Sequence, residues 1–255
     1  EKSKFVLHKL IANNKNDHAV LLINKLRLDY NQPSFFSQQL INIFDRLHQN
    51  KEAINECFIF LEHNKNNNFA YSVIYKKIFI ILERHLNDII IIEDRLPITS
   101  KQSVGNAFLE TPYLSISSQN DLNFIIETHK KLIDKFSSED AMIELANINY
   151  RILIDLDESY KLYEYVLKNS SNLKLGIEAT LGKANILLSK GDLDSSLFVV
   201  EQKIEHLNKV YNLPEDFKND LHFKKTQIIF LSGQYEKMKI ELKVKLGILQ
   251  CFLPN

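Results

Sequence analysis

Apolar residues recur every three or four positions along almost the whole chain, and short polar breaks separate these stretches. Two successive stripes consist of Leu40, Ile43, Phe44 and Leu47, and of Ile54, Phe58 and Leu61. This spacing places the apolar side chains on one face of an α-helix, whereas no stretch sustains the alternation that a half-buried strand requires. The polar breaks fall at residues 14–17, 48–50, 63–68, 155–157, 169–172 and 190–192. Connections of about three to six residues predict antiparallel helical hairpins, and therefore an all-α fold.

The predicted hairpins repeat along the chain. A small residue opens the second helix of several pairs, namely Ala19, Ala53, Ser159 and Ser196, and Met238 takes the corresponding place in a further pair. Ala19 and Ala53 are 34 residues apart, and Ser159 and Ser196 are 37 residues apart. A period near 34 predicts a helical repeat array, because a lone hairpin cannot bury its apolar face and must stack on neighbours. The small side chain lets the two backbones of a hairpin approach.

Two segments resemble tetratricopeptide repeats. Residues 155–167 (DLDESYKLYEYVL) and residues 184–193 (ANILLSKGDL) carry the small residue, the Tyr or Leu and the Gly-Asp step that are typical of that family. The resemblance covers residues 138–246 and, less closely, residues 5–63, but it does not extend over residues 69–118. The stretch from 145 to 192 is also similar to large bacterial proteins built of such hairpins.

The resemblance implies a fold and a count of repeats. It implies an α-solenoid of antiparallel helical hairpins, with roughly six to seven repeats in a chain of this length. The sequence departs from the family pattern at Ser159, Ser196 and Met238, which stand where the family usually has Ala, and it contains no Trp.

The sequence predicts three regions along the chain. We expect helical repeats over residues 1–96, an irregular loop or insertion over residues 97–118, and further repeats of the tetratricopeptide type over residues 119–255, all in one continuous solenoid. The predicted loop contains Pro97, Gly105 and Pro112. Proline removes a helical hydrogen bond and disfavours helix in the residue before it, so the helices should stop there.

The two ends of the chain carry further expectations. Residues 248–254 are apolar, so we expect this end to continue into more repeats or to meet another subunit in a homo-oligomer. The chain starts at Glu1 without Met and without a signal sequence, which we interpret as a fragment or a processed form. The compartment stays open between cytoplasm and periplasm.

Composition excludes several classes of protein. The 255 residues hold 32 Lys and Arg against 32 Asp and Glu, which argues against direct nucleic-acid binding. Only 6 Gly and 5 Pro are present, too few for most folds rich in tight turns. No stretch approaches the roughly 18 apolar residues of a membrane span. Cys57 and Cys251 lie in apolar surroundings and are predicted to be buried free thiols.

Candidate chemistry is sparse. Gly182 begins a Gly-Lys-Ala triplet in a predicted helix, where it lacks the earlier Gly and the hydroxyl of a phosphate-binding loop. Acidic residues at 139–140 and at 155–158 lie at predicted helix starts, where they favour the free amides and the dipole. No two histidines stand three or four residues apart, so no helical metal pair exists. We predict no catalytic residue, no metal ligand and no cofactor, and do not expect an enzyme.

The resemblance implies a binding function. The concave face of such an array is formed by the first helix of each hairpin, and it binds an extended or helical segment of a protein or peptide partner. Carried over residue by residue, the groove positions are Asn42, Asp45, Arg46, Glu144, Arg151, Glu178, Asn185 and Gln227. We predict a scaffold or adaptor in a larger assembly. The alternative is a peptide-sensing regulator whose effector domain lies outside this chain.

Overall fold

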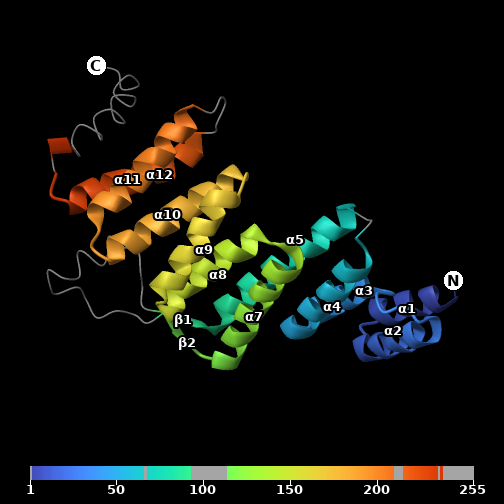
Figure 1. The fold of residues 1–255 in the computed structure, drawn as a ribbon. Coiled ribbons are helices and arrows are strands. Elements are labelled where there is room, and N and C mark those ends of the chain that lie inside the picture. Colours follow the sequence, from blue (N-terminus) through green and yellow to red (C-terminus); the bar gives the residue numbers. More distant parts are fainter. Residues whose placement is uncertain (1, 66–67, 93–113, 210–214, 235, 238–255) are drawn as a thin grey trace, which may run out of the picture. The chain divides into compact units, whose positions relative to one another are not determined.

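The computed structural model describes residues 2–65, 68–92, 114–209, 215–234 and 236–237, and this part of the chain is almost entirely helical (Figure 1). Its elements are α1 (Lys2–Ala12), α2 (Asn16–Tyr30), α3 (Ser37–Arg46), α4 (Asn50–His63), α5 (Asn68–Ile89), β1 (Ile90–Ile92), β2 (Leu114–Ile116), α7 (Gln119–Phe136), α8 (Glu139–Ile148), the π-helix η1 (Asn149–Leu153), α9 (Leu156–Asn169), α10 (Leu173–Ser189), α11 (Leu193–Asn208) and α12 (Glu215–Leu231). The helices pack against their neighbours in sequence order, which agrees with an α-solenoid. None of the helices in the described ranges is long and apolar enough to cross a membrane.

The chain divides into two compact units, residues 1–89 and residues 90–255. In the first unit, α1 pairs with α2, α3 pairs with α4, and α5 packs on α4. One core cluster joins the first hairpin to the third helix, and it consists of Leu7, Ala19, Ile23, Leu40 and Ile43. Each of these side chains comes from the apolar stripe of its helix, so burial on one face holds the unit together.

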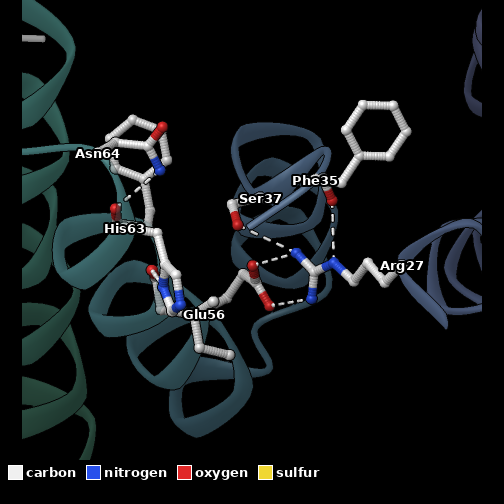
Figure 2. A network of polar contacts seen from close by, with 8 residues as sticks. Arg27, Phe35, Ser37, Glu56, His63 and Asn64 are labelled. Atoms are coloured by element: carbon white, nitrogen blue, oxygen red, sulfur yellow. Dashed lines mark hydrogen bonds and ion pairs between the residues drawn. The ribbon is translucent and has the colours of Figure 1, made fainter. Parts of the chain in front are cut away.

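A buried ion pair links the two hairpins of the first unit (Figure 2). The Arg27 guanidinium on α2 donates to both carboxylate oxygens of Glu56 on α4, at 3.0 and 2.5 Å. It also donates to the Phe35 carbonyl at 2.9 Å and to the Ser37 hydroxyl at 3.0 Å. The side chains of Arg27 and Glu56 are only 13% and 6% exposed. Because a buried charge is costly unless it is paired and hydrogen-bonded, this set of donors is needed for the pair to stabilise the fold.

The second unit alternates two rows of helices. α8, α10 and α12 form one row, in which α10 packs against both neighbours, while α9 and α11 lie between them in sequence and pair with them. A two-stranded antiparallel ribbon precedes the helices, with Ile90 opposite Ile116 and Ile92 opposite Leu114. Strand β2 falls inside the segment 97–118, which the sequence predicts to be an irregular loop. The all-α prediction therefore missed this ribbon, and residues 97–113 of the predicted loop lie outside the described residues.

The hairpin turns share one backbone motif. A residue with positive φ follows the first helix, and the N–H of the next residue donates to the carbonyl five positions back, which satisfies the free carbonyls of the helix end. The residues with positive φ are Asn14, His48, Gly191 and Gly233. The corresponding hydrogen bonds run from Lys15 to Leu10, Gln49 to Phe44, Asp192 to Leu187 and Gln234 to Ile229, at 2.9, 2.9, 2.9 and 3.2 Å.

The predicted small residues close these hairpins. Ala19, Ala53, Ser159 and Ser196 each stand fourth in the second helix, and all four are 0% exposed. Ser159 donates its hydroxyl to the carbonyl of Ala146 at 2.8 Å, and Ser196 donates to the carbonyl of Ala184 at 3.0 Å. Serine therefore replaces alanine at little cost, because the buried hydroxyl has a partner on the first helix. Met238 lies outside the described residues.

The turn between α8 and α9 contains one extra residue. Ser159 bonds a carbonyl 13 residues earlier, whereas Ser196 bonds one 12 residues earlier. The π-helix η1 accommodates the insertion, and the Asp155 N–H donates to the carbonyl of Asn149, six positions back, at 2.9 Å. The residue with positive φ is now Ile154, at 57°. A β-branched residue is disfavoured in this left-handed conformation, so the turn is strained.

Gly182 has a packing role in the middle of α10. The ring of Tyr163 from α9 occupies the space into which a Cβ at Gly182 would project. The Tyr163 hydroxyl donates to Oδ1 of Asn147 on α8 at 2.5 Å, and burial raises the pKa of this tyrosine. The Gly-Lys-Ala triplet is thus part of a helix interface, in agreement with the sequence-based rejection of a phosphate loop.

The two glycines of α10 make a matched pair of variants. Gly182→Ala should lower the free energy of unfolding by about 1–3 kcal/mol, because its Cβ overlaps the Tyr163 ring. Gly176→Ala should raise it by roughly 0.5–1 kcal/mol through helix propensity, because its Cβ meets only the flexible end of Lys203. Urea unfolding followed by circular dichroism measures both. Equal effects of the two substitutions would contradict the packing role of Gly182.

The strained turn makes a second prediction. Ile154→Gly should raise the free energy of unfolding by about 1 kcal/mol, because glycine adopts positive φ without a Cβ clash and the Ile154 side chain is 64% exposed. Leu153→Gly, inside the π-helix, serves as the control and should lower stability. Urea unfolding compares the two variants, and a loss of stability in Ile154→Gly similar to that in the control would rule out strain at this turn.

Candidate functional site

A surface pocket of about 430 Å³ opens between two first helices of the first unit, α1 and α3. Its lining consists of His8 and Ile11 from α1 and of Gln39, Asn42, Asp45 and Arg46 from α3. The spacing of three or four residues places each set on one face of its helix. Leu40 and Ile43 of α3 are buried in the core cluster on a different face. The same amphipathic pattern that buries α3 therefore presents its polar side chains to the pocket.

Asp45 is bound by two cations from α5. Nη2 of Arg84 donates to one carboxylate oxygen at 2.8 Å, and Nζ of Lys77 donates to the other. Arg84 also donates to Oδ1 of Asn50 at 2.6 Å, and Nδ2 of Asn50 lies 3.1 Å from Nδ1 of His85. Burial by itself would raise the pKa of Asp45, but the hydrogen bonds and charges of Lys77 and Arg84 hold the pKa below its ordinary value. The carboxylate therefore stays ionised and ties α3 to α5.

Arg46 is the cation that faces the pocket without an ion-pair partner in the described part of the chain. Its Nε donates to the carbonyl of Asn42 at 3.2 Å, one turn earlier on α3. This bond leaves the two Nη groups of the guanidinium available to solvent or to a ligand, because each carries its own N–H donors. The side chain is exposed.

The predicted groove residues of the second unit occupy different environments. Glu144 and Arg151 are exposed, on α8 and η1, whereas Glu178 and Asn185 are partly buried on α10. The Glu178 carboxylate lies 3.6 Å from Nζ of Lys174 on the same helix.

Gln227 differs from its prediction as a groove residue. It is only 6% exposed, and Nζ of Lys224, itself 5% exposed, donates to its Oε1 at 2.6 Å. The amide serves as a buried partner of a buried cation, a role that helical position alone does not reveal.

The structure thus brings together Asn42, Asp45 and Arg46 of the eight predicted residues in one pocket. Sequence reasoning missed Gln39, although it lies three residues before Asn42 on the same face of α3. It also missed Lys77 and Arg84, because the segment that holds α5 does not resemble the repeats from which groove positions were taken.

Two buried groups that often carry chemistry have structural roles here. Burial raises the pKa of the Cys57 thiol to about 12, so this buried free cysteine stays protonated and unreactive. Burial lowers the pKa of His129 to about 4, and its Nδ1–H donates to the carbonyl of Ile125 at 2.8 Å. Within the described ranges, no group of three or more His, Cys, Asp or Glu is placed to hold a metal ion. Cys251 lies outside these ranges.

Comparison with known proteins gives no family for the chain: neither a protein-family model nor a curated protein matches this sequence. The helical architecture agrees with an α-solenoid, and the tetratricopeptide resemblance stays a prediction.

The Asp45 ion pairs predict a pH-dependent stability of the first unit. Asp45→Asn should lower the local free energy of opening of α3 and α5 by about 1–2 kcal/mol, because charge-assisted hydrogen bonds to Lys77 and Arg84 are lost. The folded pKa lies below the ordinary value of 3.8, so this stability is fully present above that value and is lost as the pH falls through the folded pKa. Hydrogen exchange of residues 37–89, measured by mass spectrometry, reports the loss.

The control for this measurement is Asp29→Asn, at the exposed end of α2. It removes the same charge and should change protection by less than about 0.5 kcal/mol. The structural role of Asp45 would be excluded if both variants gave the same protection in α5.

Proposed function

We propose that this chain is a protein- or peptide-binding scaffold that uses the face formed by the first helices of its hairpins. The pocket of about 430 Å³ between α1 and α3 carries this proposal, because three of the side chains that line it, Asn42, Asp45 and Arg46, are groove positions implied by the resemblance to tetratricopeptide repeats. Stacked hairpins bury one face of every helix and leave the other face free along the array.

The lining of the pocket suits a peptide. Gln39 and Asn42 carry amides, each with donors and an acceptor, which match the N–H and C=O groups of a backbone segment. Ile11 adds an apolar surface for a side chain. These side chains project from α1 and α3, whose backbones are held by a shared core cluster, so the helix segments that carry them need no ordering when a ligand binds.

The second unit offers a comparable row of side chains. Glu144, Arg151, Glu178 and Asn185 lie on α8, η1 and α10, the row of helices in which α10 packs against α8. We include these residues in the proposal as a separate candidate binding region of the second unit. The regulator alternative stays a prediction, because its effector domain would lie outside this chain.

Site-specific photo-crosslinking tests the scaffold proposal. The photoreactive residue p-benzoylphenylalanine is introduced at Gln39, in the pocket, or at Asn24, on the exposed surface of α2, and each full-length variant is irradiated in an extract of the native host. We expect a discrete protein or peptide adduct from position 39 that position 24 does not give. The crosslinked segment, made synthetically, should then bind the chain at least tenfold more weakly after Asn42→Ala.

Two results would count against the scaffold. One is the same adduct pattern from both positions, which indicates collision without a specific site. The other is that the synthetic segment binds the Asn42→Ala variant and the Gln39→Ala variant as tightly as it binds the unaltered chain.

A further inference from the structure

We propose that the pocket between α1 and α3 selects an acidic segment of the partner, with a Glu or Asp carboxylate bound by Arg46. This inference rests on the proposed function, because it assigns a chemical class to the ligand of the same site. It is argued from the charged groups near the pocket and from the hydrogen bonds and ion pairs that these groups already form.

The charges near the pocket are unequal. Asp45 is the anion of the lining, and Lys77 and Arg84 together place two positive charges on its two oxygens. Arg46 adds a third positive charge. Three cations against one carboxylate leave an excess of +2 within the group. Residues 1–89 as a whole hold twelve Lys and Arg against nine Asp and Glu, so the unit has a net charge of +3 in a chain with none overall.

The geometry points to Arg46 as the anchor for an anion. Its Nε is held by the Asn42 carbonyl at 3.2 Å, which restrains the guanidinium at the edge of the pocket. The two Nη groups keep the N–H donors that form the paired hydrogen bonds of an arginine–carboxylate contact. The amides of Gln39 and Asn42 lie on the same face of α3 and can donate to the remaining lone pairs of the carboxylate.

A cationic ligand does not fit this arrangement. Its acidic partner in the lining would be Asp45, whose negative charge Lys77 and Arg84 already offset, so a further cation there would meet net positive charge. A neutral ligand would gain nothing from the excess positive charge. Charge complementarity therefore favours an acidic segment, whose affinity should also weaken as salt screens the contact.

Nuclear magnetic resonance of the full chain, labelled with ¹⁵N, tests the inference with two defined peptides. The probes are acetyl-Ala-Glu-Glu-Ala-amide and its neutral counterpart acetyl-Ala-Gln-Gln-Ala-amide. We expect the acidic peptide to shift the backbone amide signals of α1 and α3 and to bind at least tenfold more tightly than the neutral peptide. Its affinity should fall as the salt concentration rises from 50 mM to 300 mM. Arg46→Gln should abolish this difference between the peptides.

The matched control is Lys25→Gln, which removes one positive charge from the exposed surface of α2 in the same unit. It should preserve the preference for the acidic peptide. If both peptides shift the pocket amides with equal affinity, the acidic preference is wrong while peptide binding stands. If neither peptide shifts them at millimolar concentration, both the inference and the proposed function fail at this pocket. A loss in Lys25→Gln equal to that in Arg46→Gln overturns the assignment of Arg46.

Discussion

The close approach of two helix backbones at a small buried side chain is the constraint on which each described hairpin depends. Ala19, Ala53, Ser159 and Ser196 occupy the same position in their helices, and all four are fully buried. A larger residue there would separate the helices and open a void along their length. The turn motif before each of these helices sets its direction, so small size and turn geometry act together. The two serines show how narrow the requirement is, because each hydroxyl has found a carbonyl acceptor.

The packing of hairpins also decides where charge can be placed. Between the hairpins of the first unit, the Arg27–Glu56 pair is buried, and Arg27 makes four hydrogen bonds within the protein, two of them to the Glu56 carboxylate (Figure 2). Asp45 is likewise engaged by Lys77 and Arg84. Arg46 differs, because its guanidinium faces the pocket and its one described bond goes to a backbone carbonyl. The Nη groups of Arg46 therefore keep N–H donors with which a ligand can form hydrogen bonds.

The sequence allowed the periodic features to be predicted, and the structure confirms them. The predicted polar breaks coincide with connections between helices, although the connections at 31–36 and 137–138 were not predicted. The small residues predicted near the start of the second helices are buried there. The π-helix at 149–153 could not be predicted, since one inserted residue leaves the apolar stripe almost unchanged. The ribbon of 90–92 with 114–116 was missed because three-residue strands are too short to show alternation. The burial of Gln227 could not be predicted, because helix periodicity alone does not show that Lys224, one turn earlier on α12, is buried with it and donates to its amide.

The pocket lies where the side chains of two neighbouring first helices leave space between them. In the second unit, side chains bridge this row directly: the hydroxyl of Tyr150 on η1 lies 3.1 Å from that of Ser189 on α10. Between α1 and α3 the lining side chains are His8 and Ile11 on one side and Gln39, Asn42, Asp45 and Arg46 on the other, and they leave about 430 Å³ open. Among the described residues, no side-chain hydrogen bond joins α1 to α3 as the Tyr150–Ser189 contact joins η1 to α10, and the pocket lies between α1 and α3. The core cluster of Leu7, Ala19, Ile23, Leu40 and Ile43 buries other faces of α1 and α3, so the pocket leaves their polar side chains to a partner.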